Sequence, residues 1–181
     1  MNDRIYSYLL QNDVIIDREL FDYGLFTIKT YSSYLIVILP VSFIFGSLFE
    51  TLIFVFLFIS LRRFIGGYHL ENMNMCFLFS VILAIVIPLI ARAFQATSII
   101  LLMVLFVLCF ILTREFGVMD HPNKVITDSE KITYLNKALT IESVYFIVAV
   151  LSNYIGLAYI SNIILLIYLF FIISTVLCKN Q

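Results

Sequence analysis

Charged residues are scarce in this sequence, and neither sign is in excess. They make up 13% of the 181 residues and give a formal net charge of -1, whereas about 25% of the residues are charged in an average soluble domain. Proteins that bind nucleic acid need a surplus of Lys and Arg to neutralise phosphates. This sequence has no such surplus, so no nucleic-acid partner is expected.

Cysteine is also rare, and its spacing argues against two common uses. The three cysteines, Cys76, Cys109 and Cys178, lie far apart and form no C-x-x-C pair. A disulfide framework or a structural zinc cluster would need closely spaced cysteines in a regular pattern. We therefore expect free thiols, with neither a bound metal nor a cofactor.

Apolar residues, in contrast, dominate the sequence. They account for 62% of it, and the mean hydropathy is +1.06, against about 45–50% apolar residues in a soluble domain. A soluble fold of this length could not bury so much apolar surface, and several apolar stretches are long enough to cross a bilayer. The sequence therefore predicts an all-α integral membrane protein of the cell membrane.

Six membrane-spanning helices are predicted. Residues 31–61 are almost continuously apolar, but one helix of that length would measure about 46 Å, against about 30 Å for the hydrocarbon core. Gly46, Ser47 and Glu50 indicate a turn that divides this stretch into two short spans, with Pro40 kinking the first. Four further stretches have about the twenty residues that a span needs: residues 74–94, 96–113, 138–157 and 158–178.

Residues 1–30 form a polar arm that precedes the six-helix domain of residues 31–181. Apolar and charged residues are interspersed in this arm. Such a pattern is typical of one or two amphipathic helices lying in the membrane interface, although a solvated arm also fits it. The arm lacks the basic start and apolar core of a cleavable secretion signal, so the first span is expected to direct insertion.

The distribution of Lys and Arg predicts the orientation in the membrane. Cytoplasmic loops beside membrane spans carry an excess of these residues. With six spans and the N-terminus inside, Arg92 alone among the 11 Lys and Arg residues falls outside. Both termini are therefore expected in the cytoplasm, together with two polar segments, residues 62–76 and 114–137.

The first of these segments contains residues that could carry out thiol chemistry, because His69 precedes Cys76 by seven positions at a membrane boundary. A catalytic thiol needs a base within about 3 Å, or a stabilised thiolate. On one continuous helix the two side chains would stand about 10 Å apart along the axis. Gly66 and Gly67 favour irregular backbone instead, which would let His69 fold back over the following helix.

Cys76 would then lie near the N-terminus of that helix, capped by Asn72 or Asn74. There the helix dipole favours the thiolate. The spacing alone is more often typical of an inert buried cysteine beside a histidine that contacts lipid headgroups. Cys109 and Cys178 are expected to be packing residues, because neither has a histidine near it in the sequence.

The two polar segments together resemble those of a known family. The stretch Arg62-Arg63-x-x-Gly66-Gly67-x-His69, with Cys76 seven residues beyond its end, is similar to the active-site motif of the accessory gene regulator B (AgrB) family. The stretch Met119-Asp120-His121-Pro122-Asn123-Lys124 resembles the family's short Pro- and Lys-containing segment after the fourth span. The resemblance extends over nearly the whole chain in segment order, including the polar arm.

This resemblance implies a quorum-sensing cysteine endopeptidase that processes an AgrD-like propeptide. Cys76 would be the nucleophile and His69 its base, and cleavage would leave a thioester acyl-enzyme. A cysteine of the peptide would then attack this thioester and release a cyclic thiolactone, whereas some relatives form a lactone. The family also implies a homodimer. Supporting roles would fall to Arg62, Arg63, Gly66, Gly67 and Glu71, and a weak substrate contact to Lys124.

Three other functions were weighed against the same residues. A small transporter is one, with a path lined by Glu50, Arg92, Glu142 and Asn153. No pair of similar halves supports it. A metalloenzyme is another, with ligands among His69, Glu71, Cys76 and His121. Their spacing matches neither H-E-x-x-H nor the zinc deaminase pattern. A non-catalytic scaffold is the third, although a scaffold would not need a Gly-Gly-x-His segment.

The residue that orients the imidazole of His69 is not identified by the sequence. Four side chains are chemically able to accept a hydrogen bond from it and are near enough to consider: Glu71, Asn72, Asp120 and Glu142. Glu142 falls early in the fifth predicted span, where an ionisable residue is costly and usually faces a polar interior.

Overall fold

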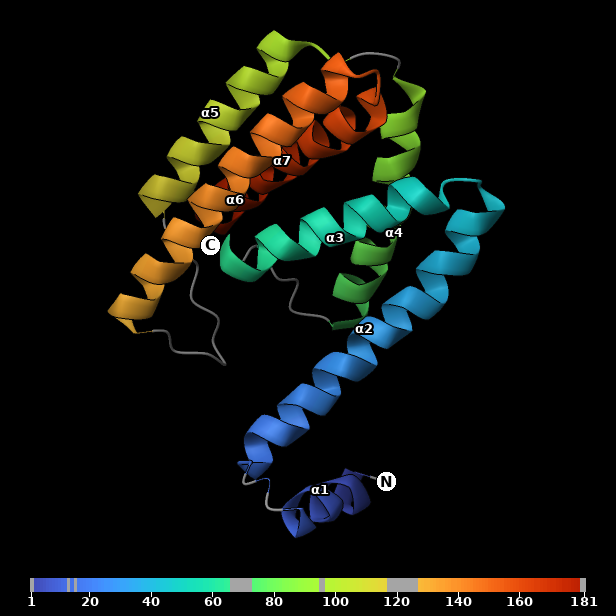
Figure 1. The fold of residues 1–181 in the computed structure, drawn as a ribbon, viewed down its shortest axis with the longest axis vertical. Helices are drawn as coiled ribbons and strands as arrows, with labels where there is room; N and C mark the ends of the chain where they lie inside the picture. Colours follow the sequence, from blue (N-terminus) through green and yellow to red (C-terminus); the bar gives the residue numbers. More distant parts are fainter. Residues whose placement is uncertain are drawn as a thin grey trace. The chain divides into compact units, whose positions relative to one another are not determined.

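The computed structural model describes residues 2–12, 14, 16–65, 73–94, 97–116 and 127–179. All regular secondary structure in these ranges is helical, which confirms the predicted all-α fold (Figure 1). The helices are α1 (Asn2–Gln11), α2 (Arg18–Ile44), α3 (Leu48–Ile65), α4 (Met73–Ala93), α5 (Ile99–Phe116), α6 (Asp128–Tyr154) and α7 (Ala158–Lys179). The chain divides into two compact units, Met1–Val41 and Ser42–Gln181.

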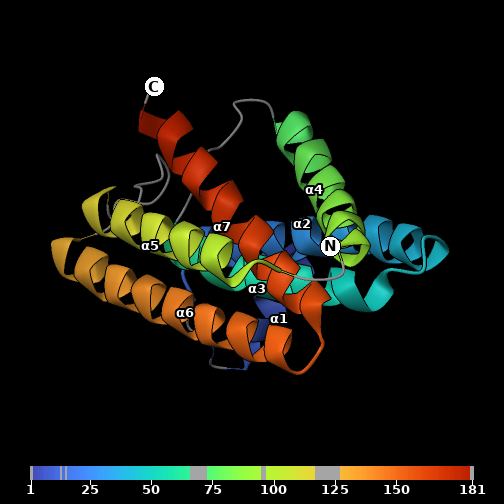
Figure 2. The ribbon, with the colours of Figure 1, turned by 90° about the horizontal axis from the view of Figure 1, so that it is seen from above.

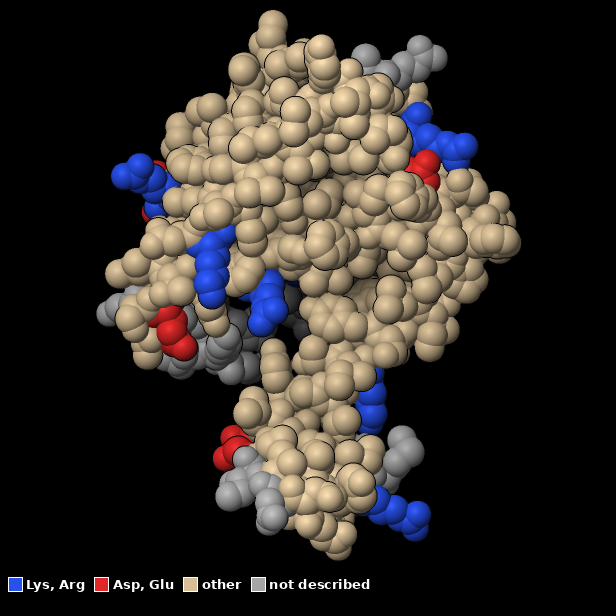
Figure 3. Space-filling view, viewed as in Figure 1, with Lys and Arg blue, Asp and Glu red and all other residues tan. Residues whose placement is uncertain are grey.

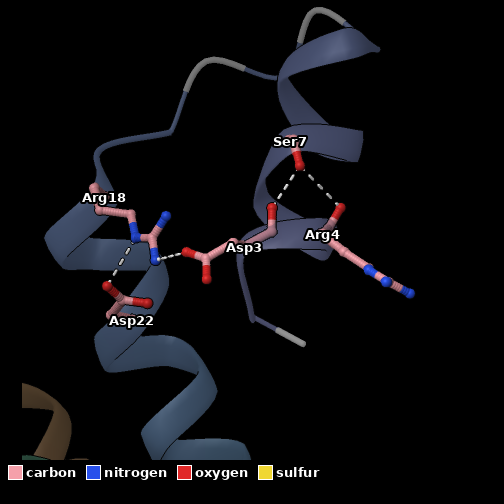
Figure 4. Close-up of polar contacts among 5 residues, drawn as sticks. All are labelled: Asp3, Arg4, Ser7, Arg18 and Asp22. Atoms are coloured by element: carbon pink, nitrogen blue, oxygen red, sulfur yellow. Dashed lines mark hydrogen bonds and ion pairs between the residues drawn. The ribbon is translucent and has the colours of Figure 1, made fainter.

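In the N-terminal unit, Arg18 at the start of α2 holds α1 in place (Figure 4). Its guanidinium contacts Asp3 over 2.6 Å and Asp22 over 2.9 Å. The guanidinium also lies 4.8 Å from the ring centroid of Tyr6, whose hydroxyl donates a hydrogen bond to the carbonyl of Ile16 (3.1 Å). Helix α1 therefore contacts the start of α2 through Arg18 and through the rings of Tyr6 and Phe21, whose centroids lie 5.1 Å apart.

Helix α2 contains both the end of the predicted arm and the predicted first span. It runs without a break from Arg18 to Ile44 and includes Pro40, so this helix begins well before Tyr31. The predicted turn is present at Gly46 and Ser47, between α2 and α3. Gly46 has a φ of 62°, a left-handed conformation that glycine adopts without steric cost.

Five of the helices in the described ranges, α2, α4, α5, α6 and α7, are long and apolar enough to cross a membrane, which indicates a multi-pass membrane protein. Helix α3 has 18 residues but carries Glu50 in its first turn and Arg62 and Arg63 in its last. Charged side chains are sparse on the face seen in Figure 3.

Helix α7 forms the core of the C-terminal unit. It contacts α3, α4, α5 and α6, and it supplies the largest group of fully buried side chains. This group consists of Ile163, Ile164, Ile167, Tyr168 and Phe171. The buried residues lie on one side of α7, whereas Leu169, Ile173 and Val176 are exposed apolar residues of the same helix, which suits a helix between a protein core and lipid.

Contacts along α6 fix the direction of α3. The hydroxyl of Tyr145 donates a hydrogen bond to the carbonyl of Leu57 (3.0 Å). Two turns further toward the end of α3, the ring of Phe64 meets that of Tyr134, near the start of α6, at 5.9 Å. The two helices are therefore antiparallel, and the end of α3 lies beside the beginning of α6.

The same reasoning orders the other helices. Phe79 near the start of α4 contacts Phe170 in the second half of α7 (6.5 Å), whereas Asn162 near the start of α7 bonds the carbonyl of Ala91 (2.9 Å). Figures 1 and 2 show α5 antiparallel beside α6. Four helix ends therefore gather at one end of this unit, which we call the loop end: Ile65 of α3, Met73 of α4, Phe116 of α5 and Asp128 of α6.

Candidate functional site

Three of the predicted site residues, Arg62, Arg63 and Cys76, lie in the described part of the chain, and all three belong to the loop end. The others lie outside the described residues. These are His69, Gly66, Gly67, Glu71 and Lys124, together with the alternatives Asn72, Asp120 and His121. The predicted meeting of His69 with Cys76 therefore stays a prediction.

Cys76 is the fourth residue of α4 and lies in its first turn. Its thiol is free, and the residue is half-buried. The first turn of a helix concentrates unpaired backbone N–H groups and the positive end of the helix dipole. Phe79, one turn further along, packs against Phe170 of α7, so this turn of α4 is anchored in the bundle.

Arg62 and Arg63 occupy the last turn of α3. The Cζ atom of Arg62 lies 5.7 Å from the ring centroid of Phe58, and that of Arg63 lies 5.9 Å from the ring centroid of Phe64. Positive side chains at a helix C-terminus are favoured by the dipole. In the sequence, Gly66 and Gly67 follow these two arginines after Phe64 and Ile65.

A groove lies between the end of α3 and the first half of α6. Its volume is about 380 Å³. The ammonium of Lys137 stands 5.8 Å from the ring centroid of Phe64, which is also the ring that Arg63 contacts. The ring of Phe64 therefore has two cations within 6 Å, and one of them, Lys137, lines the groove. The other lining residues are Thr133, Asn136, Thr140 and Ile141.

The sequence did not predict this groove, because residues 114–137 were expected to form a loop up to the fifth span. Helix α6 begins at Asp128 instead. The carboxylate of Glu130 accepts hydrogen bonds from the backbone N–H (3.0 Å) and the hydroxyl (2.8 Å) of Thr127. A Thr followed three residues later by Glu is a helix-start signal, and it would have revealed the first three turns of α6.

The loop end also has a buried polar cluster below it. Cys109 is 2% exposed, and its Sγ lies 3.6 Å from Oε1 of Glu142. Cys109 was expected to be a packing residue, and it is buried as such a residue would be.

Within the described ranges, no three His, Cys, Asp or Glu side chains come together as a metal site. The ligands proposed for a metalloenzyme lie mostly outside those ranges.

Comparison with known proteins gives one family and two curated relatives. The family model described as "Accessory gene regulator B" matches residues 2–177. AgrB-like protein 2 of Clostridium perfringens (strain 13 / Type A) is 30% identical over 142 residues, which cover 75% of this chain. An AgrB-like protein of C. perfringens (strain SM101 / Type A) is 27% identical over 142 residues, again 75% of this chain. Both matches span 66% of the relative's own length. No solved structure matches this chain.

Proposed function

Since this chain belongs to the accessory gene regulator B family, we propose that it is a membrane cysteine endopeptidase that cleaves a signalling propeptide and promotes its cyclisation for quorum sensing. The observation that carries this proposal is the position of Cys76 in the first turn of α4, at the loop end. A thiol there lies at the positive end of the helix dipole, and it follows His69 closely in the sequence.

The reaction would proceed in two acyl transfers. His69 takes the proton of the Cys76 thiol, and the sulfur attacks the carbonyl carbon of the scissile peptide bond. The C–N bond breaks, the imidazolium returns its proton to the leaving amine, and the N-terminal fragment remains as a thioester on Cys76. His69 then takes the proton of a cysteine thiol within that fragment, and its sulfur attacks the thioester. The C–S bond to Cys76 breaks as the thiolactone forms, and the imidazolium returns the proton to the sulfur of Cys76.

The choice of sulfur at position 76 has an energetic reason. Exchange of one thioester for another is close to balanced, because the bond formed and the bond broken are of the same kind. A serine at this position would give an oxygen ester of lower energy, and its conversion into a thiolactone would be uphill. Cysteine is therefore the nucleophile that allows cyclisation without a separate energy source.

We further propose that the groove beside Phe64 receives the peptide. Lys137 lines the groove and Arg63 contacts the ring of Phe64, so both supply positive charge beside it, and the side chains of Thr133 and Asn136 supply polar groups along its wall. Carboxylates of a peptide would be attracted by these cations. Lys124 would add to the same field, while Gly66, Gly67 and Glu71 would shape the segment that carries His69.

The proposed topology has six spans, with both termini in the cytoplasm and α1 in the membrane interface. Helix α3 would be the sixth span, because 18 residues rise about 27 Å, close to the hydrocarbon thickness of about 30 Å. Its charges lie in its end turns, where they can reach the interface. The loop end, which carries Arg62, Arg63, Arg114, Lys131 and Lys137, would face the cytoplasm.

The decisive experiment is capture of the acyl-enzyme. The full-length protein in vesicles is mixed with its propeptide, quenched with acid, digested and analysed by mass spectrometry. The expected result is an adduct of the N-terminal fragment on the peptide that contains Cys76, and its loss on treatment with hydroxylamine, which cleaves thioesters. Efficient cleavage with no such adduct at any quench time would reject the covalent mechanism.

A further inference from the structure

Glu142 connects three helices of the bundle. It lies in the middle of α6 and has no exposed surface. Its Oε1 accepts a hydrogen bond of 2.7 Å from the hydroxyl of Thr113 and a contact of 3.6 Å from the thiol of Cys109, both on α5. Its backbone carbonyl accepts a hydrogen bond of 2.6 Å from the hydroxyl of Tyr168 on α7.

The stability of the bundle gives no reason for a carboxyl group at this position. Burial of a carboxyl group inside a membrane bundle is expensive. Among the described residues no Lys, Arg or His forms an ion pair with Glu142, and its Oε2 has no hydrogen-bond partner. Well-packed apolar residues in place of buried charged groups are often neutral or stabilising. A leucine would therefore serve the packing at least as well, which suggests that the hydrogen bonds of Glu142 serve a function.

The position of these hydrogen bonds indicates what that function is. Thr113 lies one turn before the end of α5, and α5 ends at the loop end. One turn beyond Glu142 on α6, Tyr145 bonds the carbonyl of Leu57 on α3. The same stretch of α6 is thus fixed to α5 on one side and to α3 on the other, directly below the helix ends that border residues 66–72 and 117–126.

We propose that Glu142 is a positioning residue that sets the end of α5 against α6 at the loop end. Its side chain holds α5 through Thr113, and α6 carries one wall of the groove beside Phe64. The relative placement of groove and helix end then depends on this one acceptor oxygen. The inference rests on the proposed function in one respect, that the loop end binds and cleaves the peptide.

Three variants test this role in the full-length protein in vesicles. Glu142→Leu removes the hydrogen bonds to α5, Glu142→Gln retains an acceptor oxygen, and Thr113→Val removes the donor with little change of shape. Thr175→Val is the matched control, because the buried hydroxyl of Thr175 donates its hydrogen bond to the carbonyl of Phe171 in its own helix. Propeptide processing is measured at several substrate concentrations, together with the melting temperature of each variant.

Glu142→Leu is expected to lower kcat/KM for processing by about tenfold or more, since small displacements of positioned groups have effects of this size. Most of the loss should be a rise in KM, because the groove binds the peptide. The melting temperature should stay at or above that of the wild type. Glu142→Gln should restore processing, and Thr113→Val should lower it while Thr175→Val does not.

Wild-type processing by Glu142→Leu would overturn the proposal. Equal loss in the Leu and Gln variants would also overturn it, because that result would mean that the carboxyl group itself is needed.

A distance measurement tests the positioning role of Glu142 in the absence of propeptide. Spin labels are attached through Glu115→Cys at the end of α5 and Ile132→Cys near the start of α6, with Cys76 and Cys178 replaced by Ser and Cys109 by Ala. The distribution of distances should be narrow with Glu142 or Glu142→Gln and broader or shifted with Glu142→Leu. An unchanged distribution would refute the positioning role even if Cys76 is the nucleophile. A changed distribution would support it even if the proposed peptidase activity fails.

Discussion

The guanidinium of Arg92 donates a hydrogen bond from Nη1 to the carbonyl oxygen of Gly46, over 2.6 Å. Its Nε also lies 4.0 Å from the carboxylate of Glu50. Arg92 lies in the last turn of α4, and Gly46 lies in the turn between α2 and α3. Arg92 was the one basic residue that the predicted topology placed outside the cytoplasm. In the structure, Arg92 stabilises the turn between α2 and α3.

The first prediction concerns Gly46. A Cβ atom there would lie 3.8 Å from Nη1 of Arg92, an ordinary contact, but the φ of +62° is strained for any other residue. Gly46→Ala should therefore lower the free energy of unfolding by about 1–2 kcal/mol. Gly24→Ala is the control, because Gly24 lies inside α2 with nothing within 4 Å of an added Cβ, and it should stabilise by about 0.5–1 kcal/mol. Denaturation in detergent micelles measures both, and similar effects of the two changes would contradict this account.

The second prediction separates two cysteines. Cys76→Ser or His69→Ala should reduce propeptide processing at least about a thousandfold, as loss of a nucleophile or its base does in other enzymes. Cys109→Ala should retain most of the activity, because Cys109 is buried inside α5 and the shorter hydrogen bond from Thr113 (2.7 Å) still holds Glu142. Processing is followed by mass spectrometry in cells that express each variant at equal level. Normal processing with Cys76→Ser would remove the basis of the peptidase assignment.

The third prediction concerns the groove. Lys137→Gln removes one of the two cations beside Phe64, so KM for an acidic propeptide should rise about two- to fivefold, the effect of one exposed charge pair. The difference between variant and wild type should shrink at high salt, because salt screens exposed charges. Lys29→Gln changes a lysine of α2 and serves as the control. If the two variants have equal KM values, the groove does not bind the acidic part of the peptide.

The fourth prediction concerns the contact between α1 and α2. The hydrogen bond from Arg18, together with its positive charge, lowers the pKa of Asp3 below its ordinary value of 3.8. A carboxyl group with a lower pKa in the folded state stabilises that state above pH 3.8, and this contribution is lost as the pH falls through the lower folded value. The docking of α1 should therefore weaken only below pH 3.8.

Carbon-13 NMR of labelled aspartate checks this directly. The Asp3 carboxyl should titrate below 3.8 in the wild type and shift back toward 3.8 in Arg18→Gln. Arg4→Gln is the control, because Arg4 points away from Asp3 (Figure 4) and forms no ion pair in the described part of the chain. Identical titration of Asp3 in the wild type and in Arg18→Gln would show that the contact is not maintained in solution.

Much of the fold could be predicted from local sequence. The turn at Gly46 and Ser47 followed from a length argument, since an apolar stretch of that size exceeds the bilayer. The position of Cys76 at the start of a helix followed from the glycines and asparagines that precede it. The extent of α2 and α6 was underestimated, because polar residues such as Glu19 and Glu130 were assigned to an arm and a loop. Helical hydrogen bonding continues through such residues once capping and packing support it.

The sequence by itself determined that this chain is a helical membrane protein of the accessory gene regulator B family, because apolar length and a short motif are properties of neighbouring residues. Only the tertiary structure decided which side chains meet: Arg92 with Gly46, Lys137 with Phe64, and Glu142 with Thr113. These side-chain contacts depend on how each helix is rotated about its axis and shifted along it relative to its neighbours. Packing of many side chains at once sets that rotation, and no single stretch of sequence specifies it.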